Sequence, residues 1–292
     1  MRRGIAATTV AALLAAGGCA EPRSGSLGPA PTAVAPAAST ATAAPSSAPV
    51  PTRSTGPTTT APAPPGPTAA PSGALTIELW YVRDGRIVPT RRTRPPTVAT
   101  SRLALTELAA GPSAEEAATG LATLVPAGAE VTRIADGTAV LPAVATTGGP
   151  TATRLREAQV VWTLTQFPTV RRVRFGTATP VDRATYADLL PPIVVTAPVI
   201  GARVTSPVTV TGTADVYEAT VSVRVLDAAG RELATGFTTA TCGSGCRGDY
   251  RAAVSFRVDR EQDGTVEVYE VSPEDGSRTK VVAVPVRLAP RR

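Results

Sequence analysis

The segment TRLREAQVVWTLTQF, residues 153–167, decides the fold of the region around it. Its apolar residues recur at helical spacing and form one broad stripe: Leu155, Ala158, Val161, Trp162 and Leu164. Pro168 follows directly, and proline cannot continue a helix. The pattern predicts an amphipathic helix packed on a sheet, and VRRVRF (170–175) predicts a strand that closes the domain.

Two hairpins are predicted on the N-terminal side of this helix. The segments LTIELWYV and IVPTRRT have strand character and flank Asp84-Gly85. A second pair of short apolar segments flanks Asp136-Gly137. Asp-Gly suits the two-residue type I′ turn, which needs a positive φ at both positions, so each dipeptide predicts a tight turn between paired strands.

Two more helices are predicted between the hairpins. The first covers Ser101 to Ala110, and the second begins at Ser113, where Glu116 three residues later completes a capping box. The predicted order is therefore ββααββαβ. This order describes a compact α+β domain over residues 74–180.

Residues 193–289 follow a different period. VTVTG, TVSVRVLD, AAVSFRV and TVEVYEV alternate apolar and polar residues, and DAAG, DREQDG and PEDGS separate them as turns. About seven short strands with this spacing predict an all-β, antiparallel sandwich. Residues 181–192 are expected to be an interdomain linker.

The N-terminal segment predicts export. Residues 1–18 have a positive start, a short apolar run and small residues, as in a signal peptide. AGGC, which ends at Cys19, resembles the lipobox of bacterial lipoproteins, and the resemblance implies diacylation of Cys19 and anchoring at the extracytoplasmic face of the cell membrane. Plain secretion is the alternative. Residues 19–73 are rich in Pro, Ala, Thr and Ser and are expected to form a disordered linker.

Export leads to an oxidising compartment, where cysteines tend to pair. Cys242 and Cys246 enclose Gly-Ser-Gly, which can bend enough to join the two sulfur atoms. We expect a structural disulfide. A zinc site would need further ligands, and a redox pair would be expected as Cys-x-x-Cys. Arg247-Gly248-Asp249 is interpreted as the turn into the next strand, not as an adhesion tripeptide.

The composition argues against catalysis. The chain has no histidine, so it lacks catalytic triads that contain histidine and zinc sites that use it as a ligand, and no phosphate-binding or dinucleotide-binding glycine pattern occurs. We expect no enzyme activity, no cofactor, no metal and no nucleic-acid partner, since the net charge of +6 is modest. Calcium bound by Asp259, Glu261 and Asp263 is weighed against an ordinary acidic turn, which we favour.

Arginines on two predicted strands suggest one contact surface. Arg92 and Arg94 extend from the second strand, and Arg172 and Arg174 alternate with apolar residues on the closing strand. If these strands lie in one sheet, the four arginines form a basic face that could contact anionic wall polymer, lipid headgroups or an acidic partner. The alternative, which we favour, is a solvated face that protects the sheet edges.

Residues 75–177 resemble the sporulation and spore germination domain called GerMN. The resemblance is carried by Leu105, Leu108, Gly111-Pro112, Glu116, Leu121, Pro126, Gly128, Asp136-Gly137 and above all TLTQF (163–167). The GerMN fold is similar to the ring-building motif of secretion and sporulation assemblies. It implies protein interaction and no known catalysis.

The second domain resembles the immunoglobulin-like domain of bacterial spore-germination proteins. The resemblance is carried by Ser206-Pro207, VTGTA, VYEATV, DAAG, RGDY, VSF and EDGS. Together the two resemblances imply a non-catalytic envelope lipoprotein that acts in assembly, with an envelope protein or another copy of itself as partner. Binding of wall glycan or anionic polymer is the alternative, and regulation of an envelope hydrolase is a further one.

Overall fold

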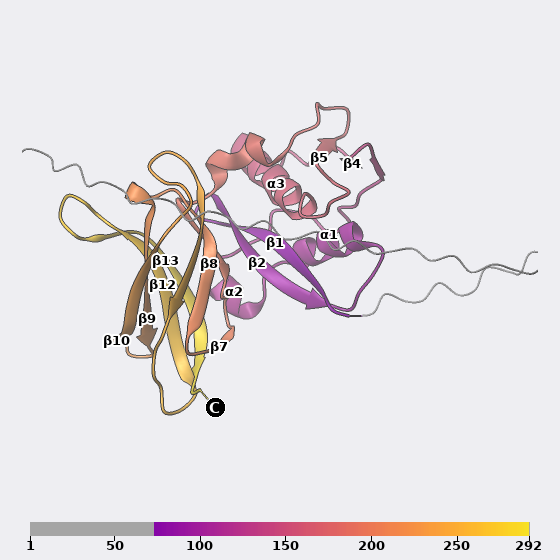
Figure 1. Cartoon of the computed structure of the whole chain (residues 1–292). Helices are drawn as coiled ribbons and strands as arrows, with labels where there is room; N and C mark the ends of the chain where they lie inside the picture. The colour runs from indigo at the N-terminus through magenta and orange to yellow at the C-terminus, as the bar shows by residue number, and fades with distance from the viewer. Residues whose placement is uncertain (1–72, 292) are drawn as a thin grey trace, which may run out of the picture. The chain divides into compact units, whose positions relative to one another are not determined.

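The computed structural model describes residues 73–291. Its first domain has the predicted order ββααββαβ, which confirms the α+β class (Figure 1). The elements are β1 (Leu75–Arg83), β2 (Arg86–Arg94), α1 (Thr100–Ala110), α2 (Ala114–Ala118), β3 (Arg133–Ala135), β4 (Thr138–Leu141), α3 (Gly149–Leu164) and β5 (Arg172–Phe175).

Both predicted hairpins form around their Asp-Gly turns. Strands β1 and β2 pair antiparallel from Leu75↔Arg94 to Arg83↔Arg86, and β3 pairs antiparallel with β4. Asp84 and Gly85 have φ values of 50° and 70°, as a type I′ turn requires. Strand β5 pairs parallel with β4, so the first domain contains one two-stranded and one three-stranded sheet.

The core of the first domain lies where α1 and α3 pack on β1. In α1, Leu105 and Leu108 are fully buried. Strand β1 is buried on both faces, since Trp80 is buried as well as the alternating Leu79 and Tyr81. Helix α3 ends at Leu164, before Pro168, so the last residues of the TLTQF segment form a turn.

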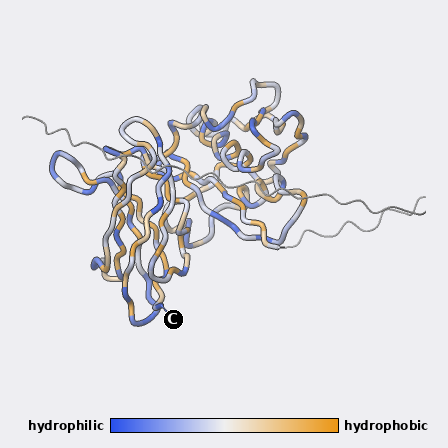
Figure 2. The backbone as a smooth tube through the Cα atoms, viewed as in Figure 1, coloured by the Kyte–Doolittle hydropathy of each residue, from blue (hydrophilic) through white to orange (hydrophobic). Residues whose placement is uncertain are grey.

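The second domain is the predicted sandwich. One sheet has the order β10-β9-β12-β13-β7, the other has the order β11-β8-β6, and all pairs are antiparallel except β13–β7. Apolar and polar residues alternate along these strands, as Figure 2 shows. The strands are β6 (Ile193–Ala197), β7 (Arg203–Thr205), β8 (Val208–Ala214), β9 (Thr220–Asp227), β10 (Glu232–Thr239), β11 (Gly248–Val254), β12 (Gln262–Val271) and β13 (Arg278–Ala289), with the 3-10 helix η2 (Tyr217–Ala219) before β9.

The segment between the domains, residues 181–192, contains the 3-10 helix η1 (Arg183–Leu189). Tyr186 is buried, and its hydroxyl donates a hydrogen bond to Glu157 of α3 at 2.9 Å. Arg154 of α3 forms an ion pair with Asp188 at 2.7 Å. Helix η1 therefore packs on α3 as part of the first domain. Within residues 73–291, no helix is both long and apolar enough to cross a membrane.

Candidate interaction surface at the end of helix α3

The second edge of β1 is closed mostly by side chains of α3 and of the turn after it. Among residues 73–291, β2 is the one strand paired with β1, and on the other edge only Val82 has a backbone partner, Ala122 at 2.8 and 2.9 Å. The remaining N–H and C=O groups of this edge need other partners. Gln166 accepts a hydrogen bond from Glu78 N at 2.8 Å and donates one to Glu78 O at 2.7 Å. Thr163 accepts from Trp80 N at 3.2 Å, and Gln159 donates to Trp80 O at 2.9 Å.

These contacts explain the polar residues of the TLTQF segment. Gln159 and Thr163 lie on one face of α3, Gln166 lies in the turn that follows, and the three side chains take the place of a third strand at Glu78 and Trp80. Gln159 and Thr163 are fully buried, so the loss of either would leave backbone groups without partners. Gln166 satisfies backbone groups of β1 that are 88 residues away in the sequence.

The two tryptophans of the chain meet beside this edge. The ring centroids of Trp80 and Trp162 are 4.5 Å apart, with planes tilted by 50°. The indole N–H of Trp80 donates to Glu78 at 3.0 Å, and Arg91 pairs with the same carboxylate at 3.4 Å. Trp162 is half-buried, and its indole nitrogen has no hydrogen-bond partner among residues 73–291.

Arg183, at the start of η1, lies on Trp162. Its guanidinium carbon is 4.6 Å from the ring centroid, a cation–π contact. Its Nε donates to Thr165 Oγ1 at 2.8 Å and its Nη2 donates to Trp162 O at 3.0 Å. Burial lowers the pKa of Arg183 below its ordinary value. Because guanidinium groups keep their proton at neutral pH, the group is a desolvated positive charge.

A hollow of about 460 Å³ opens next to Arg183. It is lined by residues 165–168, 170 and 171, which follow α3, and by residues 182–184 at the start of η1. The hollow, Arg183 and the Trp80–Trp162 pair are called the α3-end surface below. Composition and spacing did not predict this surface, because Arg183 lies in a segment expected to be a linker.

Arg92 belongs to a buried polar network of the first domain that is centred on Glu116. Glu116, only 2% exposed, accepts hydrogen bonds from Arg92, Thr90 and the backbone N–H of Ser113. The Ser113–Glu116 capping box is present as predicted. Burial alone would raise the pKa of Glu116, but these hydrogen bonds outweigh it and lower the pKa to about 2.

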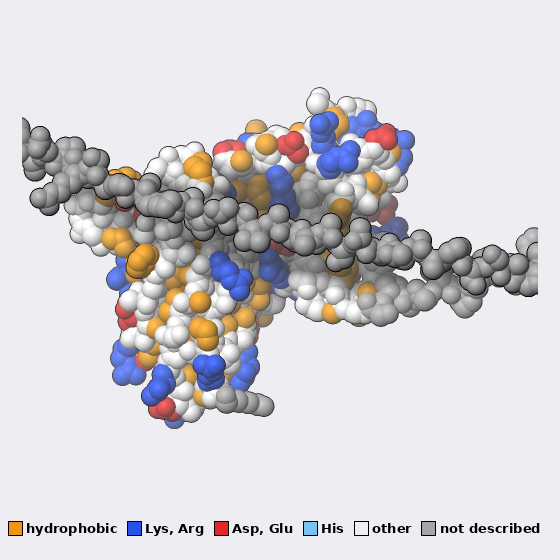
Figure 3. Space-filling view, viewed as in Figure 1, with side chains coloured by type: hydrophobic (Ala, Val, Ile, Leu, Met, Phe, Trp, Pro, Cys, Tyr) orange, Lys and Arg blue, Asp and Glu red, His pale blue; other side chains and the backbone are white. Residues whose placement is uncertain are grey.

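The four arginines of the hypothetical basic face lie on two separate sheets, because within residues 73–291 β2 pairs with β1 alone and β5 pairs with β4. Arg92 is neutralised by Glu116, and Arg94 pairs with Glu107 at 2.7 Å. Arg172 is exposed and Arg174 is half-buried. The condition for a common basic face, one shared sheet, is therefore not met, and on the face shown in Figure 3 the basic side chains stand in separate groups.

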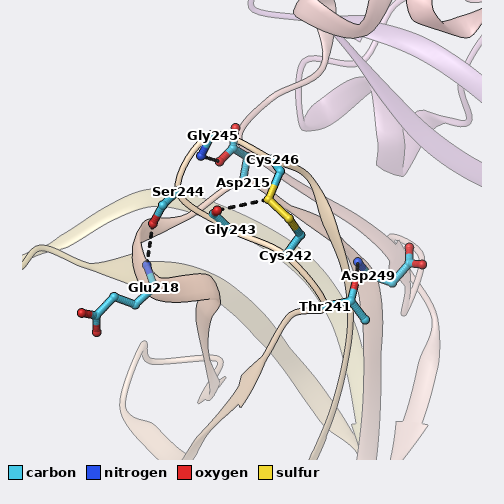
Figure 4. Close-up of a disulfide and its surroundings, with 9 residues drawn as sticks. All are labelled: Asp215, Glu218, Thr241, Cys242, Gly243, Ser244, Gly245, Cys246 and Asp249. Atoms are coloured by element: carbon cyan, nitrogen blue, oxygen red, sulfur yellow. Dashed lines mark hydrogen bonds between the residues drawn. A yellow bond between two sulfur atoms is a disulfide. The ribbon is translucent and has the colours of Figure 1, made fainter.

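The cysteine loop in the second domain carries the expected disulfide, Cys242–Cys246, with Cα atoms 5.7 Å apart (Figure 4). The loop is bound to the segment before β9. Ser244 N donates to Val216 O at 2.9 Å, and Gly245 N donates to Asp215 at 2.8 Å. These contacts are structural and give the loop no reactive group.

The Arg-Gly-Asp tripeptide after this loop also has structural roles. The Arg247 guanidinium donates to the carbonyl oxygens of Pro191 at 2.7 Å and Pro192 at 3.3 Å. Gly248 lies so close to Cys242 that a Cβ atom would be 2.1 Å from the Cys242 nitrogen. Asp249 N donates to Thr241 Oγ1 at 2.9 Å, which closes the neck of the loop. Arg247 ends the loop, whereas Gly248 and Asp249 are the first residues of β11, so only part of the tripeptide lies in the predicted turn.

The remaining candidate positions have simple placements. Glu261 pairs with Arg203 at 2.9 Å, and Asp263 pairs with Arg287 at 3.3 Å, so two of the three carboxylates considered for calcium have arginine partners. In the part of the chain that the structure describes, no three acidic or cysteine side chains gather to hold a metal ion. Cys19, residues 1–18 and most of the predicted linker lie outside the described residues.

Comparison with family models matches two domains in sequence order. Residues 71–176 match the family described as "Sporulation and spore germination". Residues 192–277 match the family described as "Immunoglobulin-like domain of bacterial spore germination". These families are not known as enzymes. Among curated proteins, no sequence matches this chain.

Three solved structures show distant likeness. The tandem GerMN domains of the sporulation protein GerM from Bacillus subtilis are 18% identical, with 75% of this chain and 61% of that chain covered and a TM-score of 0.33. This chain therefore spans less than two thirds of that structure. CopC from Methylosinus trichosporium OB3b is 14% identical (34% and 96% covered, TM-score 0.23), and WR4, a C. elegans MSP family member, is 16% identical (34% and 98% covered, TM-score 0.21). No function is transferred from these structures.

Proposed function

We propose that this chain, which carries a sporulation and spore germination domain followed by the immunoglobulin-like domain of bacterial spore germination, is a non-catalytic assembly module of the cell envelope. It binds another envelope protein or a second copy of itself. The role in spores is part of the proposal, since it rests on the domain families alone.

The α3-end surface is the observation that supports binding. Acidic groups with lowered pKa values elsewhere are occupied by structural partners, as Glu116 is by Arg92 and Glu270 is by Lys280. At the α3-end surface, a desolvated arginine on a tryptophan borders an open hollow instead. Arginine and tryptophan are enriched among the residues that carry most of the energy in protein interfaces.

Anchoring by Cys19 places this module at the membrane. The signal-like N-terminus and AGGC support a diacylated cysteine, and two acyl chains are enough for stable attachment. The segment after Cys19 then acts as a spacer between the membrane and the folded domains. Metabolic labelling with an alkyne fatty acid tests this: Cys19→Ser is expected to lose the label and move to the soluble fraction.

Crosslinking in cells tests the binding proposal. The tagged full-length chain is crosslinked in its native host, and the captured proteins are identified by mass spectrometry. We expect Trp162→Leu and Arg183→Gln to lose a captured protein that the wild type and Arg257→Gln retain, since Arg257 is an exposed arginine of the second domain. Equal capture by all four chains would refute a role for this surface.

A further inference from the structure

We infer that the hollow beside Arg183 is a carboxylate-binding site, which takes an aspartate or glutamate side chain that is next to an apolar residue in a protein partner. The inference rests on the proposed function, because it names the chemistry by which the α3-end surface would bind a protein. Three features carry it: a half-buried guanidinium without an ion pair among residues 73–291, a net charge that matches one carboxylate, and an exposed apolar residue at the rim.

Arg183 is a half-buried arginine without an ion pair among the described residues, whereas five other arginines of the first domain have a carboxylate partner. Ion pairs to described carboxylates are formed by Arg91, Arg92, Arg94, Arg102 and Arg154. Arg183 forms none within residues 73–291, and its Nη1 has no hydrogen bond there, since only its Nε and Nη2 donate. The Glu78 carboxylate favours the charge of Arg183 without forming an ion pair with it, but the effect of burial is larger. An incoming carboxylate in direct contact offsets the remaining cost while it accepts charge-assisted hydrogen bonds.

The guanidinium of Arg183 is fixed before any ligand arrives. Thr165 Oγ1 donates to Val161 O at 2.7 Å, which leaves its lone pairs to accept from Arg183 Nε. The guanidinium lies over the ring of Trp162, which is itself packed on Trp80. A group held in this way loses little conformational freedom on binding, so a contact to it contributes more affinity.

The charge of the hollow matches a single carboxylate. Its lining contains the guanidinium groups of Arg171 and Arg183 and the carboxylate of Asp182, so the net charge is +1. Asp182 accepts from Ala184 N at 3.0 Å and caps η1. This acidic group disfavours a phosphate or a polyanion, because like charges repel at short range.

The rim of the hollow indicates a peptide ligand. Pro168 is an exposed apolar residue of this lining beside the two arginines, whereas Phe167 and Val170 also line the hollow but are buried in the core. An exposed apolar side chain next to a guanidinium suits an acidic residue with an apolar neighbour, and it offers little to a hydrated wall polymer. A carboxylate-bearing protein segment therefore fits this chemistry better than an anionic polymer does.

Intrinsic fluorescence can test the site directly, because Trp80 and Trp162 are the chain's only tryptophans. The full chain in detergent is titrated with Ac-Leu-Asp-Val-NH₂ and with its isostere Ac-Leu-Asn-Val-NH₂. We expect a saturable change with the aspartate peptide, with a Kd on the order of 1 mM, and binding at least about tenfold weaker for the asparagine peptide.

Variants show whether the arginines carry this selectivity. Arg183→Gln is expected to lower the affinity for the aspartate peptide by about tenfold or more, and the exposed Arg171→Gln by a few-fold. Arg257→Gln is expected to leave it unchanged. If thermal unfolding shows that Arg183→Gln is not folded, Arg171→Gln decides the matter.

Each contrary outcome has a distinct meaning. Equal binding of the two peptides, or no binding of the aspartate peptide below about 10 mM, overturns the carboxylate assignment. Tighter binding of inorganic phosphate than of the aspartate peptide also overturns it, in favour of a phosphate-bearing ligand. Capture in cells that still depends on Trp162 and Arg183 would then leave the assembly function standing without its carboxylate chemistry.

Discussion

Replacing Glu116 by Gln removes the anion at the centre of the buried network in the first domain. The carboxylate is 2% exposed and accepts from Arg92, Thr90 and Ser113. These hydrogen bonds lower its pKa from 4.5 to about 2 in the folded chain. A difference of roughly 2.5 pKa units corresponds to about 3 kcal/mol, at roughly 1.4 kcal/mol per unit. Loss of one partner of a buried ion pair costs a similar amount, about 3–5 kcal/mol.

The pH dependence of this contribution follows from its sign. Because the folded pKa is the lower one, the stabilisation is complete above the unfolded pKa of 4.5 and is lost as the pH falls towards about 2. The free energy of unfolding of the wild type should therefore decrease by about 3 kcal/mol over this window on account of Glu116. In Glu116→Gln this part of the pH dependence should be absent, and the first domain should be about 3 kcal/mol less stable at pH 7.

Denaturant titration followed by tryptophan fluorescence measures this effect in the first domain alone, because the second domain has no tryptophan. Glu115→Gln is the matched control, since Glu115 is the exposed neighbour in the same helix. We expect the control to differ from the wild type by less than about 0.5 kcal/mol. If Glu116→Gln were equally mild, or kept the full slope between pH 2 and 5, the assignment of this network would be refuted.

Three further changes probe other contacts. Gln166→Leu should destabilise the first domain by about 1–3 kcal/mol in the same fluorescence assay, since Glu78 N and O lose their partner. The intact mass of the unreduced wild type should be lower than that of its reduced form by two hydrogens. The double variant Cys242→Ser/Cys246→Ser should lower the stability of the second domain by at most about 2 kcal/mol, measured by circular dichroism. Gly248→Ala should lower the free energy of unfolding of the second domain by more than about 3 kcal/mol, because its Cβ would meet the Cys242 backbone. Gly236→Ala should have a much smaller effect, since the nearest neighbour of its Cβ would be 3.4 Å away. Equal effects of the two substitutions would contradict this packing.

Local chemistry explains why much of the fold was predictable. Asp-Gly turns, the Ser113–Glu116 capping box and the helical or alternating spacing of apolar residues act within a few residues of each other. Both hairpins, all three α-helices and the sandwich were therefore predictable from the order of the residues. The boundaries were less so: α3 begins at Gly149, four residues before the predicted Thr153.

Contacts between distant segments explain what was missed. Glu116 is predicted as a helix cap, but nothing in its neighbourhood shows that Arg92, 24 residues earlier, binds the same carboxylate. The hypothesis of an exposed basic face that includes Arg92 did not allow for this buried carboxylate partner. A polar stripe such as Gln159, Thr163 and Gln166 would ordinarily be assigned to solvent. In the structure these side chains face β1 instead, because backbone groups of Glu78 and Trp80 have no strand partner on that edge.

The α3-end surface follows from the same arrangement. Gln166 and Thr163 fix the end of α3 against β1. This positions Trp162, in the last turn of α3, and Thr165, just after the helix, so that both contact Arg183. The residues that specify the fold thus also orient the proposed binding group, but Arg183 itself donates no hydrogen bond to β1. A change at Arg183 can therefore alter what the surface binds while the fold is retained, and the loss of Gln166 should disturb both. A comparison of peptide affinity with stability in the Arg183→Gln and Gln166→Leu chains separates the two roles: only the second variant should lose both.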